Sequence, residues 1–191
     1  KGKFLALFMV IFAVLYSTAD MTSGFIKNIA GQVRDRRGLV FAKGVSLFVY
    51  TVLTMLIFTG IQTISNALFF DELVFVKEFL QYAGIQTLLH FALLIIVMCI
   101  AIVLRNNVIS MMLSVCLCMN VLVIFYSFLD NLIAKAHIKN FHVLEYTVTG
   151  NISFLETNVT AKMAVTALAV SIAFVIVMIE VCSTVFKKRD I

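Results

Sequence analysis

The chain has 191 residues, of which 62% are hydrophobic and 13% are charged, and its mean hydropathy is +1.08. A soluble domain is roughly half apolar and a quarter charged, so this composition excludes a water-soluble globular protein. The net charge of +5 does not indicate nucleic-acid binding, because the basic residues end apolar runs and no basic face alternates with aromatic residues. We predict an all-α integral membrane protein, a polytopic helical bundle in which residues 1–191 form one transmembrane domain.

Five apolar runs approach the length of about 20 residues that a membrane-spanning helix needs. In chain order, the predicted spans cover residues 4–19, 45–68, 86–104, 108–129 and 163–186. The segments between them are a charged cytoplasmic segment, a short turn and two outer loops. The charged segment covers residues 20–43, and the outer loops cover residues 69–85 and 130–162.

The two outer loops carry different patterns. Leu73, Val76, Phe79 and Leu80 recur at helical spacing, which predicts an amphipathic helix lying at the membrane surface. The second loop contains YTVTGNISF, residues 146–154, where β-branched residues surround a glycine. This pattern predicts a hairpin or an extended piece.

The basic residues predict the orientation of the chain in the membrane. If five helices cross, nine of the fifteen Lys and Arg residues fall on one side, and they are Lys27, Arg34, Arg36, Arg37, Lys43, Arg105, Lys187, Lys188 and Arg189. Basic residues favour the cytoplasmic side, so the charged segment and the C-terminus are predicted to be cytoplasmic at the plasma membrane. Lys1 would then lie outside, and we expect one further N-terminal helix, missing from this chain, that brings the number of spans to six.

The charged segment has an internal order. Asp20, Thr22 or Ser23 offers a helix N-cap, and Phe25, Ile26 and Ile29 follow as an apolar stripe at helical spacing. The basic side chains Lys27, Arg34, Arg36 and Arg37 flank this stripe or follow it. The pattern predicts a short cytoplasmic helix parallel to the membrane, ended by a glycine and a basic turn.

This segment resembles a known family. Asp20, then GFIKNIAGQ, then a basic turn and Lys43 at the start of a long span look like the permease subunits of bacterial type-2 ATP-binding-cassette exporters. Residues Gly24, Ile26, Lys27 and Asn28 match the family's Asp…Gly-x-Ile-Lys-Asn pattern. The segment is most similar to permeases of Gram-positive bacteria that export antimicrobial or cytolytic peptides. The family has six spans, and this chain departs from it by offering five.

The resemblance implies a mechanical function. In that family the short helix, called the coupling helix, docks into a cleft of a separate cytoplasmic ATPase subunit, and a second permease copy or a sibling completes the translocation path within the membrane lipid. The implied ATPase-coupling residues are Gly24, Phe25, Ile26, Lys27, Asn28, Ile29, Arg34, Arg36 and Arg37. The chain has no G-x-x-x-x-G-K-[ST] phosphate-binding loop. ATP and magnesium would therefore bind the partner, and the chain would not be catalytic by itself.

Four polar residues within the spans are candidates for a translocation path, because exposing them to lipid is costly. They are Gln62, His90, Asn120 and Glu180. For His90 a structural hydrogen bond is the simpler interpretation, and Glu180 is expected to pair near the inner interface. The four cysteines have no metal-ligand spacing, so we expect buried, inert thiols and no metal or cofactor site in this chain.

Three alternatives remain open from the residues alone. The charged segment would be a topology anchor if no ATPase binds it. An intramembrane enzyme would rely on Cys116, Cys118 or His90, but none has a base or ligand set at usable spacing. Asn151 and Asn158 begin N-x-[ST] sequons in the second outer loop, and they would suit a multi-span interaction protein with a glycosylated outer loop.

Overall fold

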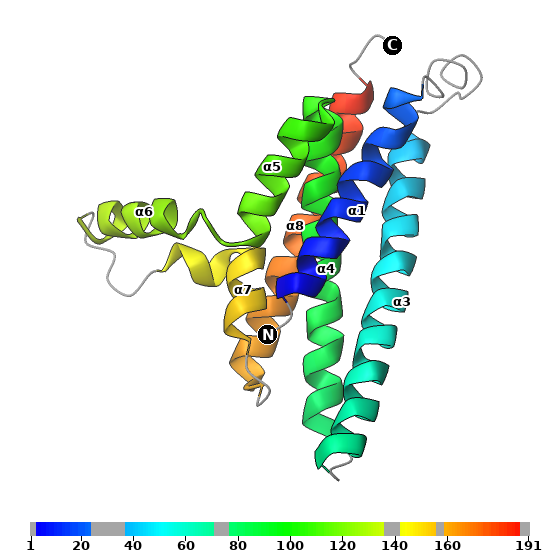
Figure 1. Ribbon diagram of the computed structural model, residues 1–191. Helices are drawn as coiled ribbons and strands as arrows, with labels where there is room; N and C mark the ends of the chain where they lie inside the picture. Colours follow the sequence, from blue (N-terminus) through cyan, green and yellow to red (C-terminus); the bar gives the residue numbers. More distant parts are fainter. Residues whose placement is uncertain (1–2, 24–36, 71–76, 136–141, 156–158, 188–191) are drawn as a thin grey trace.

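The computed structural model describes residues 3–23, 37–70, 77–135, 142–155 and 159–187, and over these residues it contains helices and no strand. Figure 1 shows the long helices standing side by side, with shorter helices along one flank and one short helix pointing sideways away from the bundle. The elements are α1 (Lys3–Thr22), α3 (Arg37–Phe70), α4 (Lys77–Leu104), α5 (Asn107–Cys118), α6 (Val123–Lys135), the 3₁₀ helix η1 (Val143–Tyr146), α7 (Val148–Phe154) and α8 (Ala161–Lys187).

Helix α4 lies at the centre of the bundle. Two thirds (67%) of its most apolar stretch is buried by the other helices, against 22% for α3 and for α8. Its sequence explains this position, because FALLIIVMCIAIVL, residues 91–104, is apolar on every side. A helix that is hydrophobic all round is stable only where it is surrounded. Helices α1, α3, α5, α7 and α8 all contact it.

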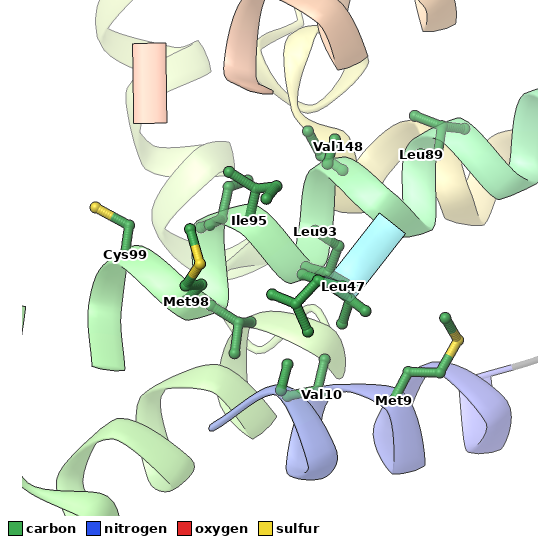
Figure 2. Close-up of a cluster of buried hydrophobic side chains, with 14 of the residues drawn as sticks. Met9, Val10, Leu47, Leu89, Leu93, Ile95, Met98, Cys99 and Val148 are labelled. Carbon is green, nitrogen blue, oxygen red and sulfur yellow. The ribbon is translucent and has the colours of Figure 1, made fainter. Parts of the chain in front are cut away.

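The core between these helices is continuous. Met9 and Val10 of α1, Leu47 of α3, Leu93 of α4 and Val148 of α7 are each at most 2% exposed, and Figure 2 shows their side chains converging on α4. Contacts of this kind are stabilised by dispersion, in which each pair of atoms contributes little and the sum is large. The same contacts hold helices together where lipid replaces water.

The turn between α4 and α5 takes two residues. Arg105 has φ 54°, in the left-handed region, and its N–H donates to the carbonyl of Ala101 at 3.1 Å, which ends α4. Asn106 then caps α5, since its Oδ1 accepts from the N–H groups of Val108 at 3.0 Å and Ile109 at 3.2 Å. The chain therefore reverses at this point, as predicted from the short polar interruption.

The predicted span over residues 108–129 is wrong as a straight helix. Helix α5 ends at Cys118, and α6 leaves at 62° from it. Asn120 has φ 57°, and the N–H of Val121 donates to the carbonyl of Cys116 at 3.0 Å. This is the Schellman motif, in which a residue in the left-handed conformation closes a helix. Asn tolerates that conformation better than any apolar residue of the run, so one residue interrupts a stretch that hydropathy alone makes continuous.

The predicted hairpin in the second outer loop is also wrong, because this region is helical. Thr147 caps α7 by accepting from the N–H of Gly150 at 3.1 Å, and η1 precedes it. A Cβ at residue 150 would collide with the carbonyl of Leu144, so glycine permits the close approach of α7 to η1. Capping and packing override the strand preference of the β-branched residues.

Several predicted boundaries change as well. Helix α3 begins at Arg37 and ends at Phe70, so residues 37–43 belong to this helix rather than to a turn. At 1.5 Å per residue its 34 residues span about 51 Å, more than the roughly 30 Å of a bilayer core. Helix α4 begins at Lys77, so residues 77–84 continue the span instead of forming a separate surface helix. Residues 71–76 lie outside the described residues.

The ends of the helices gather in two groups. In Figure 1 the C-terminal end of α1, the start of α3, the α4–α5 turn and the end of α8 lie together at the top of the bundle. The described basic residues Arg37, Lys43 and Arg105 therefore share one end, the end to which the charged segment is attached at both sides.

Candidate functional site

The predicted coupling residues fall almost entirely outside the described residues. Gly24, Phe25, Ile26, Lys27, Asn28, Ile29, Arg34 and Arg36 belong to residues 24–36, and the helix predicted there is outside the described part of the chain as well. Arg37 is the first residue of α3 and is exposed. What the structure does give is the place where the segment joins the bundle.

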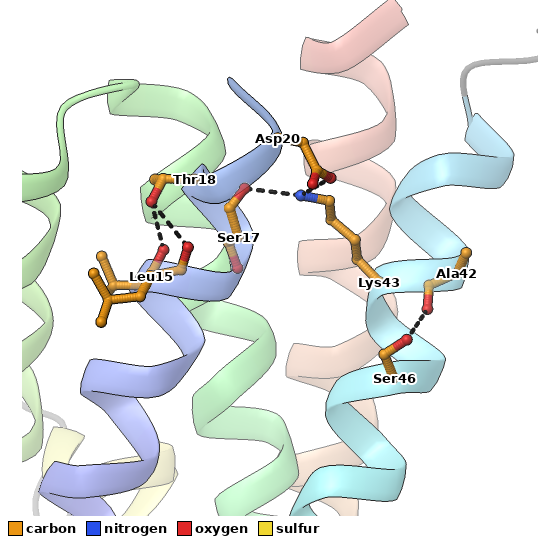
Figure 3. A network of polar contacts seen from close by, with 8 residues as sticks. Leu15, Ser17, Thr18, Asp20, Ala42, Lys43 and Ser46 are labelled. Atoms are coloured by element: carbon orange, nitrogen blue, oxygen red, sulfur yellow. Dashed lines mark hydrogen bonds and ion pairs between the residues drawn. The ribbon is translucent and has the colours of Figure 1, made fainter. Parts of the chain in front are cut away.

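An ion pair joins α1 to α3 at that place. Lys43 Nζ of α3 lies 2.7 Å from Asp20 Oδ2 of α1 and donates to the carbonyl of Ser17 at 2.9 Å. Figure 3 shows the lysine side chain crossing between the two helices to reach both groups. The exposed fraction is 12% for the Lys43 side chain and 38% for that of Asp20. We call this arrangement the Asp20–Lys43 clamp.

Aromatic rings extend the clamp toward the middle of the bundle. Lys43 Nζ lies 5.6 Å from the centroid of the Tyr16 ring, a cation–π distance. Tyr16 stacks on Phe12, and Phe12 stacks on Tyr50 of α3 with centroids 4.1 Å apart. Helices α1 and α3 approach each other less closely than either approaches α4. These long side chains therefore provide much of the contact between α1 and α3. A displacement of the charged segment would therefore act on α1 and α3 together.

A second polar site lies between four helices. A cavity of about 90 Å³ is walled by Lys3 and Leu5 of α1, by Met55, Phe58, Thr59 and Gln62 of α3, by Phe79, Tyr82, Ala83, Gln86 and His90 of α4, and by Ile152 and Ser153 of α7. We call it the Gln86 cavity. It brings together two of the predicted path residues, Gln62 and His90, which are 28 positions apart in the sequence.

The buried polar groups of the Gln86 cavity belong to one face of α4. Gln86 is 4% exposed and His90 is 6% exposed. The Gln86 amide donates to the Tyr82 hydroxyl at 3.2 Å and to the carbonyl of Ile152 at 3.3 Å, while its Oε1 is buried and has no hydrogen-bond partner among the described residues. His90 Nδ1 lies 2.7 Å from the carbonyl of Gln86. His90 therefore makes the structural hydrogen bond that the sequence favours, and it also lines a cavity.

The remaining two predicted path residues lie elsewhere. Asn120 donates to Ser153 Oγ at 2.7 Å, so it is tied to the wall of the Gln86 cavity without lining it. Glu180 is exposed on α8 and does not line that cavity. The side chain of Lys187, a cation near Glu180 in the sequence, is not described.

Sequence reasoning missed Gln86 and Tyr82, although a signal exists. Tyr82, Gln86 and His90 recur every fourth residue, which places them on one face of a helix. The predicted boundary at residue 86 separated Tyr82 from the span. Because α4 begins at Lys77, the three residues belong to one helical face.

The described cysteines agree with the prediction except at one position. Cys99, Cys118 and Cys182 are buried, whereas Cys116 is exposed. The C-x-C spacing turns the second thiol away from the first on a helix, so the two cannot share an environment. Among the described residues no group of three or more His, Cys, Asp or Glu is arranged to hold a metal ion.

The sequon at Asn151 is engaged within the fold. Its amide donates to the carbonyl of Glu145 at 2.7 Å and to that of Thr147 at 2.9 Å, and the residue lies in α7. Asn158, the other predicted acceptor, lies outside the described residues.

The helices define the class of the protein. Over the described residues four helices are long and apolar enough to cross a membrane, and five if α5 and α6 form one bent span, as expected of a helical membrane protein. The chain belongs to the family described as "Protein of unknown function (DUF2705)", which it matches over residues 2–191. No curated protein and no solved structure matches the chain.

Proposed function

We propose that this chain is the membrane-spanning permease subunit of an ATP-driven exporter. It forms the translocation path, is not catalytic by itself, and is coupled to a separate cytoplasmic ATPase subunit that binds ATP and magnesium. Its cargo is an amphipathic peptide of the antimicrobial or cytolytic kind. The pattern Asp…Gly-x-Ile-Lys-Asn, which begins at Asp20, is the sequence feature behind this proposal.

The Asp20–Lys43 clamp is the observation that carries the proposal furthest. A coupling helix can drive transport only if its displacement moves the membrane helices. If the segment were joined to the bundle by flexible linkers alone, its displacement would not move those helices. Here the last helical turn of α1 and the second turn of α3 are held together by a 2.7 Å ion pair and a 2.9 Å hydrogen bond. Asp20 and Lys43, the residues at the two ends of the segment that resembles the exporter permeases, make this contact.

The Gln86 cavity supports the transport part of the proposal. Polar groups buried among apolar helices are costly and are retained where a substrate or a water-filled path uses them. Gln86 and His90 are such buried groups, and together with the exposed Gln62 they line one cavity between α1, α3, α4 and α7. A tilt of α1 and α3 transmitted through the clamp would move two walls of this cavity relative to α4. The shape of the cavity would thereby be linked to the ATPase cycle.

The test is purification of the chain from its native membranes in mild detergent, with identification of the proteins that accompany it. We expect a stoichiometric ATPase with a phosphate-binding loop. In reconstituted vesicles the double variant Phe25→Ala/Ile29→Ala should keep basal ATP hydrolysis by the ATPase and lose ATP-dependent peptide export.

A matched control replaces one Ile and one Phe near the C-terminal end of α3, far from the charged segment. Ile64 and Phe69 are 62% and 80% exposed, and Ile64→Ala/Phe69→Ala should leave export coupled to hydrolysis. The absence of an ATPase, or normal export by the Phe25→Ala/Ile29→Ala variant, would overturn the proposal. The charged segment would then be a topology anchor.

A further inference from the structure

Among the described residues that line the Gln86 cavity, one is a lysine and none is acidic. This residue, Lys3, contributes an ammonium group. Lys3 is exposed, so it stands at the opening, whereas Gln86 and His90 lie deep. An ammonium group without an acidic partner among the described lining residues attracts an anion and repels a cation. The opening of the cavity therefore favours a ligand that ends in a negative charge.

The uncharged polar groups of the wall add a donor and two acceptors. Tyr82 accepts a hydrogen bond from Gln86 at 3.2 Å and so keeps its own hydroxyl proton for a ligand. In the interior, Gln86 Oε1 is an acceptor without a partner among the described residues. Because the Nδ1 proton of His90 is used on the carbonyl of Gln86 at 2.7 Å, its Nε2 is an acceptor too. A matching ligand accepts hydrogen bonds at one end and donates one nearby.

The Thr59 and Ser153 hydroxyl groups in the wall already donate within the fold. Thr59 donates to the carbonyl of Met55 at 2.8 Å, and Ser153 donates to the carbonyl of Thr149 at 3.0 Å while accepting from Asn120. The rest of the wall is mostly apolar, with Leu5, Phe58, Phe79 and Ile152 among its members. A volume of about 90 Å³ holds roughly three water-sized groups at about 30 Å³ each. That room suits a single small residue rather than a folded ligand.

We propose that the Gln86 cavity binds the C-terminal residue of an apolar peptide. The terminal carboxylate accepts from Lys3 Nζ and the Tyr82 hydroxyl, the N–H of the same residue donates to Gln86 Oε1, and its side chain lies against Phe58 and Phe79. This inference rests on the proposed function for the peptide nature of the cargo, and it assigns the end of the peptide that is recognised. A free fatty acid offers the same carboxylate but has no adjacent N–H.

The experiment is a binding titration with the purified full chain in lipid nanodiscs, without any ATPase. The probe is acetyl-Trp-Leu-Val as the free acid, compared with the same peptide ending in an amide. The chain contains no Trp, so indole fluorescence reports the probe alone. We expect the acid to bind at least about tenfold more tightly than the amide, the loss expected for one charge-assisted hydrogen bond.

Variants test the assigned contacts. Lys3→Met should abolish the preference for the acid, and Lys3→Arg should retain it. Gln86→Leu should weaken acid and amide alike, because it removes the acceptor for the N–H. Lys162→Met, which changes an exposed lysine on α8, should leave both affinities unchanged. Each variant is first required to show the thermal unfolding midpoint of the unchanged chain within a few degrees.

Two results would overturn the inference. The first is equal binding of acid and amide by the unchanged chain. The second is displacement of the peptide acid by decanoate at equal concentration, which would assign the cavity to a carboxylate without a peptide N–H. Because no ATPase takes part, preferential binding of the acid would stand even if no ATPase accompanies the chain, and the two proposals therefore fail separately.

Discussion

The Asp20–Lys43 clamp should contribute measurably to the stability of the chain, and two substitutions divide that contribution between its two contacts. Lys43→Met removes both the ion pair at 2.7 Å and the hydrogen bond to the carbonyl of Ser17 at 2.9 Å, while it keeps an apolar stem of similar length. Asp20→Asn removes the charge of the partner and leaves the contact between Lys43 and Ser17 in place. The two variants therefore separate the two interactions.

The expected sizes differ because the two contacts differ in exposure. Asp20 is 38% exposed, so water compensates for much of the lost partner, and the ion pair contributes about 1 kcal/mol at most. The bond from an ammonium group to a buried carbonyl contributes about 1.5–3 kcal/mol. Lys43→Met should therefore lower the free energy of unfolding by about 2–3 kcal/mol and Asp20→Asn by about 1 kcal/mol or less.

The assay measures the thermal unfolding midpoint of the solubilised chain. Unfolding is monitored by the fraction of the protein that remains monodisperse after heating. For a chain of this length 1 kcal/mol shifts the midpoint by about 2–4 °C, so Lys43→Met should lower it by roughly 4–12 °C. The control is Lys162→Met, which changes an exposed lysine for which the described residues offer no ion pair. Its free energy of unfolding should change by no more than about 0.5 kcal/mol.

The order of the effects decides the outcome. The effect of the double variant Asp20→Asn/Lys43→Met should be smaller than the sum of the single effects by about 0.5–1 kcal/mol, because the shared ion pair is lost only once. Additive effects, or a Lys43→Met variant as stable as Lys162→Met, would refute the reasoning. In that case α1 and α3 would be joined at this end without the clamp.

Two further predictions concern the core and the break after α5. Leu93→Ala should lower the free energy of unfolding by about 2–5 kcal/mol, since Leu93 is 1% exposed at the centre of the bundle. The control Leu56→Ala, at a residue that is 63% exposed, should change the unfolding midpoint little. Similar shifts of the midpoint for both variants would contradict the central position of α4. Asn120→Ala should destabilise by about 1–3 kcal/mol through its left-handed backbone and its lost bond to Ser153. Asn120→Gly relieves the backbone strain but not the lost bond, so it should be the milder change, and equal effects would refute a role for the backbone.

The sequence predicted the existence of the helices better than their ends. A run of about 20 apolar residues leaves the backbone no partner but itself, so a helix follows from composition over a long window. The ends depend on single residues that a window averages away. Lys77 and Glu78 look like loop residues by charge, yet they form the first turn of α4. Arg37 looks like part of a basic turn, yet it begins α3.

The break at Asn120 is a second case in which a single residue decides where a helix ends. Residues 108–129 are apolar enough for one span, and nothing in hydropathy requires an interruption. The break depends on the left-handed conformation of one residue and on its bond to Ser153, 33 positions away. A contact of that sequence separation is not encoded in local preference. The strand preference around Gly150 failed for a related reason, because capping by Thr147 and packing against η1 decided the local structure.

The helical class, the positions of the apolar runs and the gathering of the charges can be derived from the amino-acid sequence, because they follow from the cost of exposing peptide groups and charges to an apolar solvent. Which polar side chains meet could be learned only from the packed helices. Lys3, Gln62 and Gln86 come from three helices and share one cavity, and Asp20 reaches Lys43 across the charged segment that separates them. Such meetings depend on how whole helices pack around α4, and packing is set by the shapes of all the contacting surfaces together.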